Sequence, residues 1–275
     1  MVYMKMPKSV SPFVEFIIFG LKEAQACVFA GSFLVLLFLS NHIAIPGVYR
    51  YDFLFIAALL IQLVLYLTKL ETKDEVKVIF LFHIIGLALE IFKTNPAVGS
   101  WSYPEPAFFK IGTVPLYSGF MYAAIGSYLS QAWKIFNAEL SDHSWYTQSM
   151  VLCALIYANF FTNHWLYDFR WFLIAAVFMI FWKTKFLYTV KKRRSIPLVL
   201  AFVLIAFFIW VAENFSTYWG AWQYPYQIAA WSLVSFHKIA SWFLMVIISF
   251  IIVADLKYFK KLRDRDGDGL PKMAR

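Results

Sequence analysis

The feature that most constrains this chain is a series of long apolar segments separated by short loops. Eight such segments follow one another, at residues 16–40, 53–70, 76–93, 108–131, 147–163, 168–188, 196–214 and 231–255. A helix that crosses a bilayer needs about 20 mostly apolar residues. The chain is 61% hydrophobic and 15% charged, whereas soluble domains have roughly 45–50% apolar and about 25% charged residues. The sequence therefore predicts an all-α, polytopic membrane protein with about eight transmembrane helices.

The lysines and arginines predict the orientation of these helices. With eight spans, 20 of the 25 basic residues lie on the side of both chain ends, and five lie on the other: Arg50, Lys93, Lys110, Arg170 and Lys238. Cytoplasmic loops carry the excess of lysine and arginine in membrane proteins. We therefore expect both termini in the cytoplasm. This asymmetry accounts for the net charge of +9 without a nucleic-acid partner.

Four short motifs recur in the same order, 118 to 123 residues apart. They pair Ser40-Asn41-His42 with Thr162-Asn163-His164, Ile56–Ala58 with Ile174–Ala176, Glu90–Thr94 with Glu213–Thr217, and Gly99–Pro104 with Gly220–Pro225. The pattern predicts two tandem four-helix repeats, at 1–131 and 132–256, and then a basic cytoplasmic tail at 257–275. Because each unit has an even number of spans, the two repeats should be parallel, related by an axis along the membrane normal.

Glu90 and Glu213 are the candidate catalytic residues. Each comes near the end of an apolar segment, and a carboxylate inside a membrane is a functional candidate by default. A protonated carboxyl group can act as a general acid, and aromatic faces stabilise cations. This combination suits the protonation of an alkene, after which the cation is captured or rearranged.

Thirteen further residues are candidates for contacting a substrate, because they belong to the repeated motifs or are histidines near them. These are His42, His83, Phe92, Asn95, Trp101, Tyr103, Asn163, His164, Asn214, Phe215, Trp222, Tyr224 and His237. Several have structural alternatives. Tryptophan and tyrosine at this depth also form the aromatic belt of membrane proteins, and Glu90 could pair with Lys93 one turn later.

Neither a metal nor a cofactor is expected. Two cysteines and five histidines are scattered along the chain without metal-ligand spacing. In the tail, Asp264, Asp266 and Asp268 match the opening of a calcium-binding loop, but Arg275 stands where that loop has its closing glutamate. The alternative for this segment is a solvated tail.

Two stretches carry a resemblance to a known family. Glu23–Cys27, which reads Glu-Ala-Gln-Ala-Cys, and Glu90–Pro104 resemble the YoaT-like bacterial membrane proteins, a family of unknown function. The resemblance covers nearly the whole chain. It implies a multi-pass protein of the bacterial inner membrane.

A fainter resemblance concerns the chemistry. Glu90-Ile91-Phe92, Trp101, Tyr103 and Gly112–Leu116 are similar to the repeated unit of small membrane carotenoid cyclases and carotenoid hydratases. Those families imply acid-initiated chemistry on polyene ends without a redox cofactor. The acidic pair that follows the proline in the cyclase pattern is replaced here by Leu116, Tyr117 and Ser118.

Three classes of function stay open at this point. The first is a membrane enzyme, of lyase or isomerase type, that acts on an isoprenoid or similar lipid. The second is a transporter for a small solute, and the third is a non-catalytic membrane scaffold. The repeated polar residues lie on one side of the predicted bundle, which favours a one-sided site for a membrane lipid or another hydrophobic small molecule.

Overall fold

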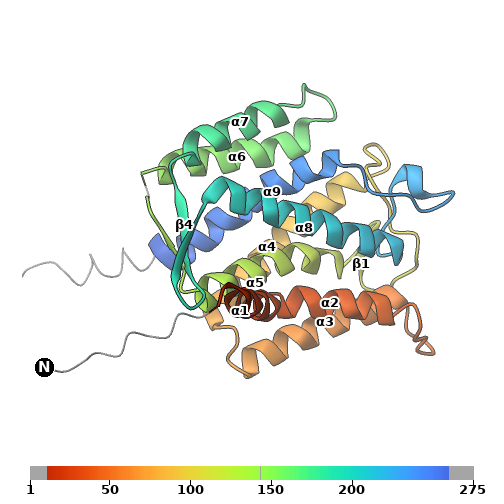
Figure 1. Ribbon diagram of the computed structural model, residues 1–275. Coiled ribbons are helices and arrows are strands. Elements are labelled where there is room, and N and C mark those ends of the chain that lie inside the picture. The colour runs from red at the N-terminus through yellow and green to blue at the C-terminus, as the bar shows by residue number, and fades with distance from the viewer. Residues whose placement is uncertain (1–10, 143, 260–275) are drawn as a thin grey trace, which may run out of the picture.

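The computed structural model describes residues 11–142 and 144–259, and most of them are helical (Figure 1). The α-helices are α1 (Pro12–Ala26), α2 (Val28–Leu39), α3 (Arg50–Leu67), α4 (Lys73–Lys93), α5 (Ser118–Ile135), α6 (Tyr146–Thr162), α7 (Arg170–Phe181), α8 (Leu198–Tyr218) and α9 (His237–Ala254). A 3₁₀ turn covers Pro225–Gln227, and a π-helical turn, Asp255–Phe259, continues α9. The candidate calcium loop at 264–268 lies outside the described residues.

Two small antiparallel sheets make the all-α prediction incomplete. β1 (Lys110–Ile111) pairs with β2 (Val114–Pro115), while β3 (Glu139–Leu140), β4 (Lys185–Thr189) and β5 (Arg193–Pro197) form a sheet in that order. The second sheet lies at the left of Figure 1, where α1 begins and α9 ends. Its register places Leu187 of β4 between Glu139 of β3 and Ser195 of β5.

Three predicted segments are partly non-helical, and local interactions give the reason. In 108–131, Gly112 adopts a φ of +59° between β1 and β2, which favours glycine in a tight turn. The Asp52 carboxylate accepts the backbone N–H groups of Phe108 and Phe109, each at 2.8 Å. The helix therefore begins only at Ser118.

The other two segments are shortened in similar ways. In 168–188 the helix ends at Phe181, because the apolar residues of 185–189 pair with β5 instead. In 231–255 the first six residues form a loop that α8 holds. There, Asn214 Oδ1 accepts the N–H of Val234 at 2.8 Å, and Trp210 Nε1 donates to the Val234 carbonyl at 3.0 Å.

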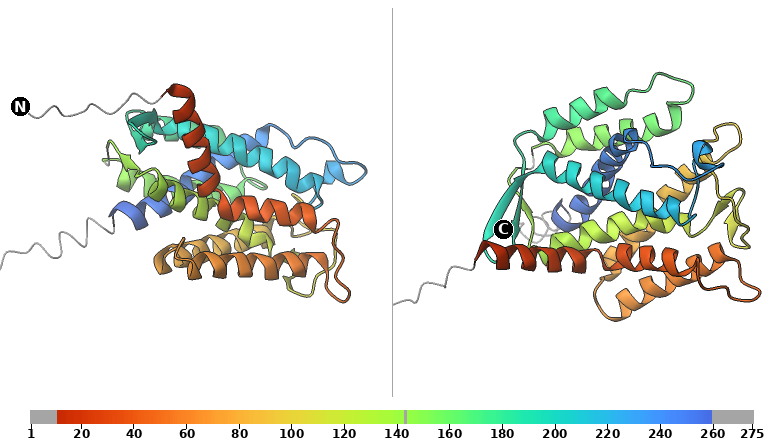
Figure 2. Two further views of the ribbon diagram at one scale, coloured as in Figure 1. Left: turned by 60° about the horizontal axis from the view of Figure 1, so that its bottom comes forward. Right: turned by 45° about the vertical axis from the view of Figure 1, so that its right-hand side comes forward.

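The first predicted span is broken. α1 and α2 meet at Cys27 with a bend of 70°, seen where red turns to orange in the left view of Figure 2. Among the described helices, three are long and apolar enough to cross a membrane: α3, α8, and α9 with its following turn. The bent pair would be a fourth. By this criterion the predicted eight spans are not confirmed.

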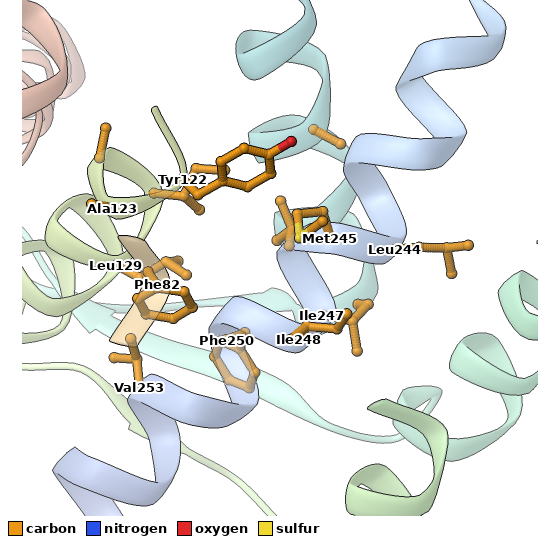
Figure 3. Packing of buried hydrophobic residues seen from close by; sticks show 14 of the residues in the cluster. Phe82, Tyr122, Ala123, Leu129, Leu244, Met245, Ile247, Ile248, Phe250 and Val253 are labelled. Atoms are coloured by element: carbon orange, nitrogen blue, oxygen red, sulfur yellow. The ribbon is translucent and has the colours of Figure 1, made fainter. Parts of the chain in front are cut away.

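The core forms where α4, α5, α8 and α9 pack together. Figure 3 shows Phe82 of α4 and Tyr122 of α5 near Met245 and Phe250 of α9. α4 and α5 approach closely because small residues line their contact: a Cβ added at Gly126 would overlap the Phe82 ring. Close approach through small residues is common between membrane helices.

The outward faces of the helices remain apolar. Leu60 of α3, Trp171 and Met179 of α7 and Phe208 of α8 are each more than half exposed. Soluble monomers rarely expose contiguous apolar patches larger than a few hundred Å². These faces are therefore compatible with a membrane protein.

Candidate functional site

Four helices, α2, α4, α6 and α8, end at the same end of the bundle, on the right in Figure 1. We call this the junction end. Asn41, just after α2, donates from Nδ2 to the carbonyl of Trp219, just after α8, at 3.1 Å. Lys93 at the end of α4 donates to Asn163 Oδ1 after α6, also at 3.1 Å. Residues from the first half of the chain thus contact residues from its second half at this end.

The loops that follow α4 and α8 touch through a pair of reciprocal hydrogen bonds. Ser102 N–H donates to the Gln223 carbonyl at 2.9 Å, and Gln223 N–H donates to the Ser102 carbonyl at 3.0 Å. These two residues are 121 positions apart, the same separation as the repeated Gly99–Pro104 and Gly220–Pro225 motifs. The loops after α4 and α8 are therefore held against each other at the junction end.

Glu90, near the end of α4, is 2% exposed. Its Oε2 accepts hydrogen bonds from Trp101 Nε1 and from the Tyr103 hydroxyl, both at 2.7 Å. Its Oε1 accepts the hydroxyl of Tyr122 on α5 at 2.8 Å. Three donors therefore hold the Glu90 carboxyl group, and a buried carboxylate needs such partners.

Glu213 occupies the corresponding place on α8 and is 3% exposed. The Tyr224 hydroxyl donates to Oε1 at 2.5 Å, and Nε1 of Trp242 on α9 donates to Oε2 at 2.8 Å. Each glutamate therefore has a tyrosine from its own following loop and a second aromatic donor from the next helix. Glu213 has one donor fewer than Glu90, so it has more capacity to meet a ligand.

The two loop tyrosines are fixed as donors. Burial, together with the Glu90 carboxylate, raises the pKa of the Tyr103 phenol well above its ordinary value. Burial and Glu213 raise the pKa of Tyr224 in the same way. Both phenols therefore keep their protons over the physiological pH range and continue to donate to the glutamates.

Lys238, which was not among the predicted site residues, lies between Glu90 and Glu213. Its Nζ is 4.4 Å from the ring centroid of Tyr224 and 5.2 Å from that of Trp101. It also lies within electrostatic reach of both Glu90 and Glu213. A sequence signal existed, because Lys238 is one of the five basic residues on the side poor in lysine and arginine.

Tyr122 and Trp242 are the other two side chains that the sequence analysis missed. They stand 120 positions apart, near the repeat offset, and their ring centroids are 6.3 Å apart. A comparison of residue identities does not pair them, because one is tyrosine and the other tryptophan. Only their separation of 120 positions, close to the offset of the repeated motifs, could have indicated them.

Lys93 binds the second Asn-His motif instead of pairing with Glu90. Its Nζ donates to Asn163 and lies 2.9 Å from His164 Nε2. Burial, followed by the charges of Lys93 and Lys238, lowers the pKa of His164. The neutral imidazole is therefore favoured, and it can accept the Lys93 ammonium. Phe92 packs beside this group, 4.8 Å from Phe161 and 6.1 Å from His164 between ring centroids.

Several predicted site residues lie away from the two carboxylates. Asn214 holds the loop at Val234, and Asn95 accepts the N–H of Ala97 at 3.0 Å. His83 is buried against Phe120, with ring centroids 4.5 Å apart. His237 is exposed at the start of α9.

The remaining predicted residues line the junction end. Phe215 is half exposed and stacks on Trp219 with ring centroids 5.4 Å apart. Trp222 is buried two positions before Tyr224. His42 lines a surface cavity of about 250 Å³ whose wall includes Arg50.

Arg50 joins the two halves at this end. It donates to Ser40 Oγ at 2.9 Å, to Glu105 at 2.5 Å, and to the carbonyls of Trp219 and Gly220 at 2.5 and 3.2 Å. Its donors are occupied by the protein, so we assign it a structural role. Within residues 11–142 and 144–259, no three His, Cys, Asp or Glu residues are grouped so that they could hold a metal ion.

These features define a helical protein with apolar helices compatible with a membrane and two buried, aromatic-held carboxylates where its halves meet. The chain belongs to the family described as "Protein of unknown function (DUF817)", whose model matches residues 15–250. It is 50% identical over 244 residues to "Uncharacterized protein YoaT" of Bacillus subtilis (strain 168), covering 88% of this chain and 92% of that protein. No solved structure matches.

The predicted YoaT-like relationship is thereby confirmed. The fainter resemblance to carotenoid cyclases and hydratases is not confirmed by these comparisons.

Proposed function

We propose that this protein is a multi-pass protein of the bacterial inner membrane that carries out cofactor-independent, acid-initiated chemistry on an isoprenoid or other lipid alkene. The observation that carries the proposal is the pair of buried carboxyl groups, Glu90 and Glu213, set among aromatic side chains at the junction end. An intramembrane carboxylate is expensive and marks function by default. The partner is a membrane lipid or a hydrophobic small molecule.

The proposed fold has eight spans in two parallel four-helix units, with both termini cytoplasmic. In this arrangement α1 and α2 form one bent span and α3 to α9 form the other seven. The reciprocal contact of Ser102 with Gln223 and the matched donors on Glu90 and Glu213 support it. The 20-to-5 distribution of basic residues supports the orientation.

The proposed reaction begins with proton transfer from the Glu213 carboxyl group to one carbon of the alkene. The O–H bond breaks, a C–H bond forms, and the other alkene carbon becomes cationic. Aromatic faces of Trp101 and Tyr224 stabilise that cation, while the Glu90 carboxylate adds a fixed negative charge. The cation then either loses a proton from a neighbouring carbon to water or captures water and loses one O–H proton, and in both cases that proton returns through water to the Glu213 carboxylate.

Lys238 has a definite place in this scheme. Its ammonium group lies over the aromatic rings of Trp101 and Tyr224. It therefore occupies the position in which the substrate cation would form during the proposed reaction. We propose that Lys238 withdraws when substrate enters. Until then, its positive charge balances the negative charge of the Glu90 carboxylate.

The test is mass spectrometry of small molecules that co-purify with the protein in mild detergent. Wild type is compared with the Glu90→Gln, Glu213→Gln double variant. We expect a polyene or isoprenoid on wild type and an accumulated precursor on the variant. Ordinary phospholipid on both would refute the proposal.

A small-solute transporter is the second candidate, favoured by the 70° break between α1 and α2. Interrupted helices line the substrate sites of many transporters. Solute uptake into proteoliposomes distinguishes the two, because a carrier moves solute without changing it.

A further inference from the structure

Another buried carboxyl group, that of Glu71, lies at the other end of α4 from Glu90. Glu71 precedes α4 and is 2% exposed. Its Oε1 accepts a hydrogen bond from Ser127 Oγ of α5 at 2.5 Å, and its Oε2 accepts one from Gln62 Nε2 of α3. We call Glu71, Gln62 and Ser127 the Glu71 cluster.

The Glu71 carboxyl group has no basic partner within residues 11–142 and 144–259, where six ion pairs form elsewhere. Its charged neighbours are engaged with other groups. Glu75 pairs with Lys257, and Lys134 donates to the Leu70 carbonyl at 3.2 Å. A buried charge without a partner is strongly unfavourable, so Glu71 either holds a proton or takes a cation from solution.

A free oxygen beside the carboxyl group points to a bound ligand. Gln62 is 4% exposed, and its Nε2 is directed at Glu71. In the described part of the chain its Oε1 has no hydrogen-bond donor. A buried acceptor left unsatisfied costs about 1–3 kcal/mol. A cation that binds both the Glu71 carboxylate and this oxygen would satisfy the two groups together.

Space for an ion exists beside Glu71 and Ser127. A cavity of about 30 Å³ is lined by Glu71, Ser127 and Gln131, and by Gln25 and Val28 on either side of the helix break. A site needs only about 10–15 Å³ to hold one water-sized particle. The cavity therefore admits one small ion and excludes an organic solute.

We propose that the Glu71 cluster binds one monovalent cation of the size of Na⁺ at the break between α1 and α2. One carboxylate and neutral oxygens of Gln62 and Ser127 match a single positive charge. A divalent ion such as Ca²⁺ takes six to eight oxygen ligands, often from several carboxylates. The positive charge of Lys134 nearby would also repel a divalent ion more strongly than a monovalent one. This site is separate from Glu90 and Glu213, and the inference does not depend on the function proposed for them.

The protonation of Glu71 makes the site sensitive to pH. Burial is the largest influence on the Glu71 pKa and raises it, and the negative charge of Glu75 raises it further. The hydrogen bonds from Ser127 and Gln62 and the positive charge of Lys134 lower this pKa and so partly oppose the effect of burial. On α1, Glu23 accepts the Tyr128 hydroxyl at 3.1 Å. A cation and a proton therefore compete for Glu71, and acid releases the cation.

The test is thermal unfolding of the purified full chain in mild detergent, with NaCl against choline chloride at equal ionic strength. We expect the Tm to rise with Na⁺ and to saturate. Because one proton competes with one ion, the apparent Kd should weaken about tenfold for each pH unit below the Glu71 pKa.

Two variants and one control complete the experiment. Glu71→Gln should abolish the Na⁺ effect, and Ser127→Ala should weaken it, which keeps the test valid if the first variant fails to fold. Glu139→Gln, on β3, is the matched control and should retain the full effect. Equal Tm values in both salts, or a Na⁺ effect that survives in Glu71→Gln, would overturn the proposal.

Discussion

At the scale of single residues, Glu90 and Glu213 differ although their positions correspond. Glu90 accepts three hydrogen bonds and Glu213 accepts two. A carboxylate offers about four acceptor positions, so Glu213 has more free capacity. We infer that Glu90 supplies fixed charge while Glu213 meets the substrate.

The loop tyrosines should contribute measurably to stability. Removing the hydroxyl in Tyr103→Phe or Tyr224→Phe takes a donor from a buried carboxyl group, and hydrogen bonds to charged groups are worth about 1.5–3 kcal/mol. Thermal unfolding in detergent should show a loss of that order for each variant. Tyr226→Phe, whose hydroxyl makes only a 3.4 Å contact with the Ser235 N–H, is the control. Equal stability of all three variants would contradict the role of Tyr103 and Tyr224 as donors to the buried carboxyl groups.

His164 should make the fold sensitive to mild acid. Because burial and the nearby lysines lower its pKa, the unfolded chain takes up a proton first as the pH falls below about 6.5. Stability is therefore full above that pH and is lost as the pH falls through the lower folded-state pKa. NMR titration of His164 should give a midpoint below 6.5, and Lys93→Met should move it upward. An unchanged midpoint in Lys93→Met would argue against the contact.

At the scale of helices and strands, hydropathy predicted where helices occur but not where they end. The hydropathy of Phe109 and Phe186 is equally compatible with a helix, a hairpin or a strand. Other residues determine their conformation: the turn at Gly112 for Phe109, and pairing with β5 for Phe186. The break at Cys27 has no proline or glycine beside it, so local sequence gave no sign of it.

The contact between α4 and α5 should be intolerant of added volume. Gly126→Ala places a methyl group against the Phe82 ring, and such overpacking typically costs about 1–3 kcal/mol. Gly31→Ala on α2 is the control, since its added Cβ meets nothing within 4 Å. We expect a lower Tm for Gly126→Ala than for Gly31→Ala. The same Tm in both would mean that α4 and α5 pack less closely.

At the scale of the whole molecule, the repeated motifs led to Glu90, Glu213 and the loop tyrosines. Each glutamate also needs a donor from the following helix, Tyr122 or Trp242, which lies 29 to 32 residues away. No local pattern predicts such a contact. Lys238 was missed for the same reason, because its aromatic partners belong to both halves.

The contact between the halves can be tested by a disulfide. Ser102 and Gln223 exchange both backbone hydrogen bonds, so their Cα atoms should be about 5.5 Å apart, within the range of a disulfide. Ser102→Cys with Gln223→Cys, in a background with Cys27 and Cys153 changed to Ala, should oxidise readily. Gel mobility before and after reduction detects the crosslink. A pair that stays reduced under oxidant would contradict the junction.

The central claim is that Glu213, with the Glu90 carboxylate nearby, protonates a lipid alkene, and deuterium tests it most directly. Purified protein in lipid nanodiscs would be incubated in D₂O with an apolar extract of the host membranes. Mass spectrometry should then find a lipid product with one carbon-bound deuterium for wild type, and none for the Glu90→Gln, Glu213→Gln variant. If wild type places no deuterium on carbon in any lipid, the two glutamates do not start such a reaction.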